Sequence, residues 1–106
     1  MMETTKRRRL ERAGWRVGTA DAFLGLTEAE SALVEMRLAL GEALRRRRAS
    51  ARMTQLTLAK RIRSSQSRVA KMEAGDPSVS LELLIRAHIS LGATRRDVAR
   101  VLVAAS

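Results

Sequence analysis

The segment QSRVAK, residues 66–71, concentrates side chains that can hydrogen-bond nucleobases. The amide of Gln66 can pair bidentately with adenine, and Arg68 or Lys71 can bond O6 and N7 of guanine in the major groove of a duplex. No acidic residue, which phosphate groups would repel, occurs from residue 43 to residue 72. The outward positions predicted to read DNA bases are Gln66, Ser67, Arg68 and Lys71.

The charge of the chain also favours a polyanionic partner. Its net charge is +10 over 106 residues. Residues 43–72 contain ten basic and no acidic residues, whereas residues 73–106 contain four of each. A basic patch gains binding free energy by releasing counterions from phosphate. The alternative is that the charge serves solubility, but interspersed charges would serve it better, so nucleic acid is the favoured partner.

Two short helices with a tight turn between them are predicted to position these side chains. Thr54 begins the first helix, which runs through Ile62, and either Ser64 or Ser65 caps the second, which Gly75 closes after about Ala74. The apolar side chains expected to face inward are Leu58, Ala59, Ile62, Val69 and Met72. This arrangement is a helix-turn-helix, with the small residue Ala59 where the two helices cross.

The remaining pattern is helical throughout. The sequence TEAE at residues 27–30 predicts a capping box, with Thr27 bonding the third helical amide and Glu30 reaching back. It opens a helix to about Ser50, whose predicted buried stripe is Leu33, Met36, Leu40 and Leu44. Further helices are expected from Ser80 to Leu91, before Gly92, and from Thr94 to the C-terminus. Two short helices are expected earlier, one ending at Gly14 and one between Thr19 and Gly25.

Length and composition predict a single all-α domain, residues 27–106, preceded by a basic N-terminal arm, residues 1–26. With one tryptophan and one phenylalanine in the chain, the core must be aliphatic. The chain has no cysteine and no apolar run of about 20 residues, the length of a membrane span, so we expect a soluble protein of the cytoplasm with no membrane partner.

The residues Thr54-Gln55, Leu58-Ala59, Ser65-Gln66-Ser67, Val69, Glu73 and Gly75 resemble the pattern of the Cro/cI-like, or XRE, helix-turn-helix family, with agreement over about residues 33–92. The resemblance implies a five-helix, lambda-repressor-like fold and a sequence-specific regulator of transcription. It also implies that the helix after the turn enters the major groove and places Ser65, Gln66, Ser67 and Lys71 near base edges.

Further roles are implied by the same resemblance. Gln55 would hold a phosphate, and Arg48 would form a partly buried salt bridge with Glu73. The other residues predicted to contact phosphate are Thr54, Arg45, Arg46, Arg52 and Arg63. For Arg45, Arg46, Arg47 and Arg52 plain solvated charge is the alternative interpretation.

Two positions depart from the family pattern. Arg63 occupies the turn position where glycine is usual, and a left-handed backbone there would cost roughly 1 kcal/mol. His88 lies on the apolar face of its predicted helix, where an aliphatic residue is usual. A lone histidine without cysteine or a second histidine is expected in a core or interface rather than in a metal site. The serines have no base near them in sequence, so we expect neither catalysis nor a cofactor.

The two ends of the chain leave alternatives open. Trp15 can pack the arm onto its own domain, which we favour, or anchor a partner. The last helix carries Val98, Val101 and Leu102 at helical spacing, which can complete the core. In the family the corresponding region often builds a two-fold dimer, so these three residues are also the predicted homodimer interface, and both roles can hold together.

The lead-in KRRRLERAGWRVG...FLGLTEAE resembles the segment before this domain in HigA antitoxins. This second resemblance implies the antitoxin of a type II toxin–antitoxin module, which binds a RelE- or HigB-like toxin and represses its own operon at a palindromic operator. A stand-alone XRE-family regulator is the alternative. RNA binding is less favoured, because the chain lacks an aromatic stacking platform. Either regulator is expected in bacterial cytoplasm, on the nucleoid when bound to its operator.

Overall fold

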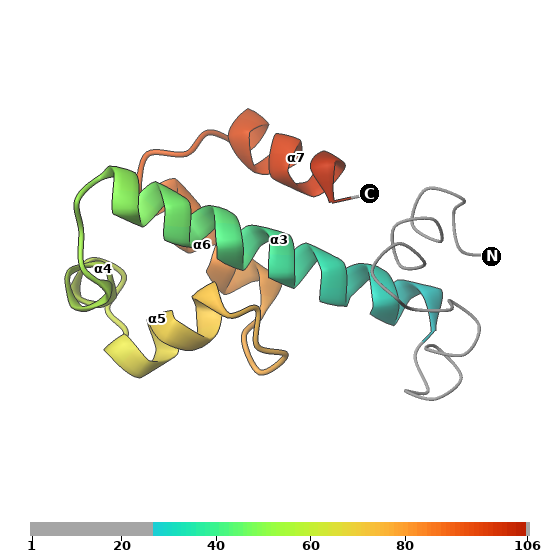
Figure 1. The fold of residues 1–106 in the computed structure, drawn as a ribbon, viewed down its shortest axis with the longest axis horizontal. Coiled ribbons are helices and arrows are strands. Elements are labelled where there is room, and N and C mark those ends of the chain that lie inside the picture. Colours follow the sequence, from blue (N-terminus) through green and yellow to red (C-terminus); the bar gives the residue numbers. More distant parts are fainter. Residues whose placement is uncertain (1–26, 106) are drawn as a thin grey trace. The chain divides into compact units, whose positions relative to one another are not determined.

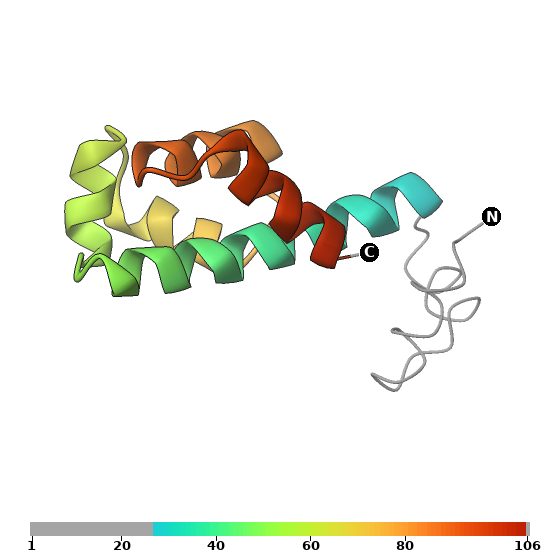
Figure 2. The ribbon, with the colours of Figure 1, turned by 90° about the horizontal axis from the view of Figure 1, so that it is seen from above.

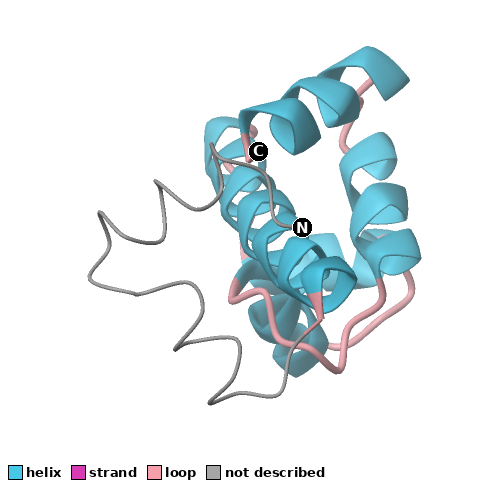
Figure 3. Ribbon diagram, turned by 90° about the vertical axis from the view of Figure 1, so that its right-hand side faces the viewer, coloured by secondary structure: helices cyan, strands magenta, loops and turns pink. Residues whose placement is uncertain are grey.

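The computed structural model describes residues 27–105. Within that range the chain forms five α-helices and no strand: α3 (Glu28–Ser50), α4 (Gln55–Arg61), α5 (Gln66–Glu73), α6 (Leu81–Ser90) and α7 (Arg95–Ala104) (Figures 1 and 3). The all-α, five-helix prediction is confirmed, with helix ends close to the predicted ones. The two short helices predicted before residue 26 lie outside the described residues.

Residues 34–105 form one compact unit. In it, α5 and α7 lie on opposite sides of α3 in the view of Figure 1, whereas the view from above draws both on the side of α3 that carries α6 (Figure 2). The helix α7 runs antiparallel to α3, so its first turn lies near the C-terminal end of α3 (Figure 1). No helix among residues 27–105 is both long and apolar enough to cross a membrane.

The core of this unit is aliphatic, as predicted. Its largest fully buried side chains are Leu40, Leu44, Leu58, Met72, Leu84, His88, Val69 and Val79. One part of the predicted stripe on α3 is wrong, because Leu33 is 36% exposed and Met36 is only partly buried. The helical period was right, but the buried cluster on α3 begins at Leu40.

Side-chain caps fix where the helices begin. Thr54, Ser65, Ser80 and Thr94 each accept a hydrogen bond from the amide three residues on, at 3.0–3.2 Å. At the start of α3, the Thr27 hydroxyl accepts from the Glu30 amide at 3.1 Å and donates to the Glu30 carboxylate at 3.0 Å. Each such cap contributes about 1 kcal/mol, so the predicted starts follow directly from residue type.

Gly41 allows α3 and α5 to approach closely. A Cβ added at this position would lie 2.4 Å from the Met72 carbonyl oxygen and 2.9 Å from that of Glu73. These are backbone atoms at the end of α5, which cannot move aside as a side chain could. Gly41 therefore sets the distance at which the end of α5 packs on α3.

His88 is a buried core residue. It is 1% exposed, and its Nε2 lies 2.9 Å from the carbonyl oxygen of Leu40 in α3. Burial lowers the pKa of His88, and the charge of Arg47 acts in the same direction, while the bond to Leu40 opposes them. The neutral imidazole therefore donates its proton to the Leu40 carbonyl and links α6 to α3.

We expect this histidine to make stability depend on pH near neutrality. Because its folded pKa is lowered, its contribution is complete above the unfolded value of about 6.5 and is lost as pH falls toward the folded pKa. Urea unfolding at about pH 7.5 and about pH 5.5 should show a smaller free energy of unfolding at the lower pH. His88 is the only histidine in the chain, so His88→Leu should remove this difference. An unchanged difference in that variant would contradict the assignment.

Candidate nucleic-acid interface

The turn between α4 and α5 is short because one residue adopts a left-handed backbone. Arg63 has φ 56°, which turns the chain directly after Ile62, the C-cap of α4. The Ser64 amide then returns to the Ala59 carbonyl at 2.7 Å, and Ser65 caps α5. A non-glycine residue in this conformation costs roughly 1 kcal/mol, as the sequence predicted for Arg63.

The helix α5 has one buried and one exposed face. Val69 and Met72 are 0% exposed and fix the inner face in the core. All the side chains predicted to read bases are exposed, namely Ser65, Gln66, Ser67, Arg68 and Lys71. The first turn of α5 contains no acidic residue. The structure thus brings the five predicted base-reading residues together on one short helix and its cap.

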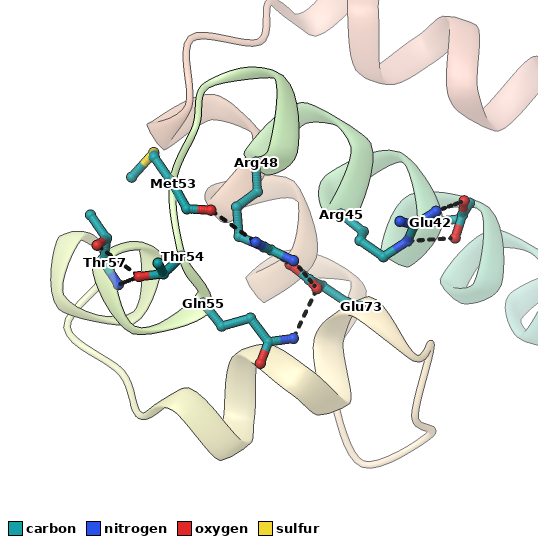
Figure 4. Close-up of polar contacts among 8 residues, drawn as sticks. All are labelled: Glu42, Arg45, Arg48, Met53, Thr54, Gln55, Thr57 and Glu73. Atoms are coloured by element: carbon teal, nitrogen blue, oxygen red, sulfur yellow. Dashed lines mark hydrogen bonds and ion pairs between the residues drawn. The ribbon is translucent and has the colours of Figure 1, made fainter.

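The orientation of α5 depends on a polar cluster at its C-terminal end (Figure 4). The Arg48 guanidinium bonds both Glu73 carboxylate oxygens, with Nε–Oε2 2.5 Å and Nη2–Oε1 3.0 Å. Its Nη1 donates to the Met53 carbonyl at 2.8 Å. The Gln55 amide donates to the same Glu73 Oε1 at 3.0 Å. The Glu73 cluster, Arg48, Met53, Gln55 and Glu73, therefore joins α3, the start of α4 and the end of α5.

The Glu73 cluster is shielded from water. The exposed fractions of the Arg48 and Glu73 side chains are 16% and 5%. The hydrogen bond to Glu73 is the main cause that raises the pKa of Arg48. Gln55, predicted to hold a phosphate, uses one of its two amide hydrogens on Glu73, so a second hydrogen remains for a phosphate oxygen.

The four consecutive arginines 45–48 have different neighbours, because successive helical residues point about 100° apart. Arg48 joins Glu73 towards α5, whereas Arg47 lies 4.0 Å from Asp97 of α7. Arg45 bonds Glu42 at 2.6 Å in an exposed pair, and this bond lowers the pKa of Glu42. Arg46 is exposed. Arg45 and Arg46 are the two arginines of this run that were predicted to contact phosphate, and Arg45 already pairs with the Glu42 carboxylate.

The other predicted phosphate contacts lie at the two ends of α4. Arg52 precedes α4 and Arg63 follows it, and both are exposed with φ 56°. Thr54, the cap of α4, is also exposed. No pattern in the sequence indicated the left-handed conformation of Arg52. The two strained backbone positions hold arginines on either side of one short helix.

The predicted dimer residues on α7 are not equally accessible. Val98 is 6% exposed and belongs to the core of its own chain. Val101 and Leu102 are partly buried against that core, and Val103 is 71% exposed. The alternative that α7 completes the core holds for Val98, and the most exposed large apolar side chain of this helix, Val103, is in its last turn.

Sequence reasoning missed two features near this surface. Gly41 is needed for the approach of α3 and α5, but a single glycine inside a helical pattern has no such signal by itself. Asp97 completes a capping box with Thr94 and also bonds Arg100, although the TxxD spacing could have indicated the box. Among residues 27–105 no group of three or more histidine, cysteine, aspartate or glutamate side chains could hold a metal ion.

A capped two-helix turn with a core-facing side and an exposed basic helix defines a helix-turn-helix DNA-binding domain. Residues 44–102 match the sequence model of the helix-turn-helix family HTH_3. The chain therefore belongs to this XRE-type, or Cro/cI-like, family of DNA-binding transcription regulators. Searches of curated proteins and of solved structures found no match to the chain.

We expect Glu73→Ala to destabilise the fold by about 3–5 kcal/mol, because it leaves the Arg48 guanidinium partly buried without its carboxylate. Glu82→Ala is the matched control. Its partner is Arg86, both side chains are 73% exposed, and its loss should cost less than about 1 kcal/mol. Urea unfolding measures both variants, and equal losses would contradict a structural role for the Glu73 cluster.

Proposed function

We propose that the protein is a repressor that reads a specific DNA sequence by placing α5 in the major groove. The observation that carries the proposal is the division of α5: its inner face is fully buried, and every polar side chain on its outer face is exposed. A rigid helix that presents Gln66, Arg68 and Lys71 matches the donor and acceptor pattern of base edges. Ser65 and Ser67 add hydroxyl groups at the N-terminal end of α5, the end that would enter the groove.

Phosphate contacts would position α5 around this reading surface. Thr54 and Gln55 lie at the start of α4, and the Glu73 cluster holds the Gln55 amide in place. The exposed guanidinium groups of Arg46, Arg52 and Arg63, together with Arg45, supply charge near this side. Such contacts fix the register on DNA but carry no sequence information.

Two kinds of substitution should separate reading from positioning. Gln66→Ala and Lys71→Ala should each relax base preference by about 1–3 kcal/mol at one position per half-site. Arg52→Gln should instead weaken binding to all DNA sequences alike and reduce the log–log salt slope of binding by about one. Titration of labelled duplexes at several salt concentrations measures both effects. Equal affinity for duplex and single strand, insensitive to Gln66, would overturn the groove-reading proposal.

We further propose a homodimer through the last turn of α7 that binds a palindromic operator. Val103, 71% exposed beside Leu102, is the apolar surface that supports this interface. A two-fold dimer would set the two α5 helices about 34 Å apart, one turn of DNA.

Because Val103 is exposed, Val103→Asp should leave the fold intact while it breaks the dimer. Sedimentation should then show a monomer, and affinity for a two-half-site operator should fall toward that for one half-site. The matched control is Ile89→Asp, an apolar side chain on α6 that is 50% exposed. A Val103→Asp protein that sediments and binds like wild type would exclude this interface.

The finer proposal is that the repressor is the antitoxin of a type II module and binds a RelE- or HigB-like toxin. The feature that supports it is the 26-residue arm, which precedes the family match at residues 44–102 and includes Trp15 and Phe23. A partner bound there would leave α5 free, and coupling between the two sites would give autoregulation. A stand-alone regulator, whose arm packs on its own domain or follows DNA, is the alternative.

Deleting residues 1–26 should distinguish the two regulators. For an antitoxin we expect loss of rescue from the toxin encoded beside the gene, with operator affinity retained. Growth rescue in cells and operator titration in vitro measure the two activities separately. Absence of a neighbouring toxin gene, together with a loss of DNA affinity alone, would favour the stand-alone regulator.

A further inference from the structure

A second concentration of arginines lies away from α5, where the first turn of α7 meets the end of α3. We name it the α7 basic surface, and its members are Arg47, Arg95, Arg96 and Arg100. Arg95 and Arg96 are exposed, and the Arg100 and Arg47 side chains are 70% and 33% exposed. Since α7 lies above α3 and α5 below it in the view of Figure 1, one straight duplex on α5 does not account for these charges.

The single acid at this surface is already engaged. The Asp97 carboxylate accepts from the Thr94 amide at 2.8 Å and from Arg100 at 2.5 Å, and Arg47 lies 4.0 Å away. Four arginines against one aspartate leave a net charge of +3. Neither Arg95 nor Arg96 has an acidic partner among the ion pairs of residues 27–105.

The position of Arg95 and Arg96 is unfavourable for the helix itself. They occupy the first turn of α7, where the helix dipole is positive and acidic residues are preferred. Two cations there cost stability rather than add to it. A phosphate group would reverse this, because it would interact favourably with the arginines and with the helix N-terminus together.

We infer that the α7 basic surface binds the phosphate backbone of a second DNA duplex segment while α5 occupies its site. The inference rests on the proposed reading role of α5, and it adds bridging of two DNA segments to that role. On α7 the surface uses Arg95, Arg96 and Arg100, whereas the proposed dimer uses the last turn, so the two do not compete for residues.

A capture assay tests the inference with the full chain. A biotinylated duplex that carries the operator is immobilised with bound protein, and a fluorescent duplex without the operator is then added. Wild-type protein should retain the second duplex. The variant Arg95→Gln/Arg96→Gln should bind the operator with unchanged sequence preference but capture much less of the second duplex. The log–log salt slope for binding of the second duplex should be shallower by about 1.8, for two lost phosphate contacts. Arg86→Gln on α6, 73% exposed, is the control for removal of charge and should capture normally.

The outcomes separate this inference from the proposed function. Operator binding by wild type without second-duplex capture, or equal capture by the Arg95→Gln/Arg96→Gln protein, would overturn the inference and leave the reading role of α5 intact. If the second α5 of a dimer captured the second duplex, the Arg95→Gln/Arg96→Gln protein would capture it as well as wild type does, and the inference would be overturned. A Gln66→Ala protein whose base preference is unchanged at every position would instead overturn the reading role of α5. Thermal unfolding of the double variant should occur at or above the wild-type temperature, because both arginines oppose the helix dipole.

Discussion

The bond between Arg48 and Glu73 is the constraint on which the candidate interface depends. A seven-residue α4 and an eight-residue α5 are too short to be stable alone, so their orientation must come from contacts with α3. Glu73 supplies such a contact at the end of α5, and Gln55 extends it to the start of α4. Gly41 makes the geometry possible, because a side chain there would keep the end of α5 away from α3. A buried ion pair is a weak source of net stability, and its value here is the fixed angle of the exposed face of α5.

Local signals predicted most of the fold. Thr54, Ser65, Ser80 and Thr94 are caps whose hydroxyl groups act within one turn, so residue type indicates where each helix begins. For α5 it left Ser64 and Ser65 as alternatives, and the structure has Ser65 as the cap. Gly75 and Gly92 end helices with positive φ for an equally local reason. The exposure of Leu33 could not be predicted in this way, because helical period gives the direction of a stripe but not the length of helix that neighbours cover.

The candidate site shows the same division between local and distant causes. The exposed set on α5 follows from the buried pair Val69 and Met72, since a helix with one fixed face exposes the other. Arg45 pairs locally with Glu42, three residues before it, whereas the partners of Arg47 and Arg48 lie 50 and 25 positions away. In sequence these arginines are equivalent members of one run. Only the packing of α5 and α7 on different sides of α3 gives Arg47 and Arg48 separate partners.

Four exposed arginines at the ends of helices occupy positions that do not favour an arginine. Arg52 and Arg63 occupy left-handed positions that glycine would fill without strain, and each costs roughly 1 kcal/mol. Arg95 and Arg96 stand in a helix turn that favours acids. The aliphatic core gains nothing from these four exposed arginines, so folding alone gives no reason for them. The proposed phosphate contacts would give one, because cations at turns and helix ends can reach a DNA backbone that the helices themselves hold at a distance. The arginines that least suit the fold are therefore those for which we propose phosphate contacts.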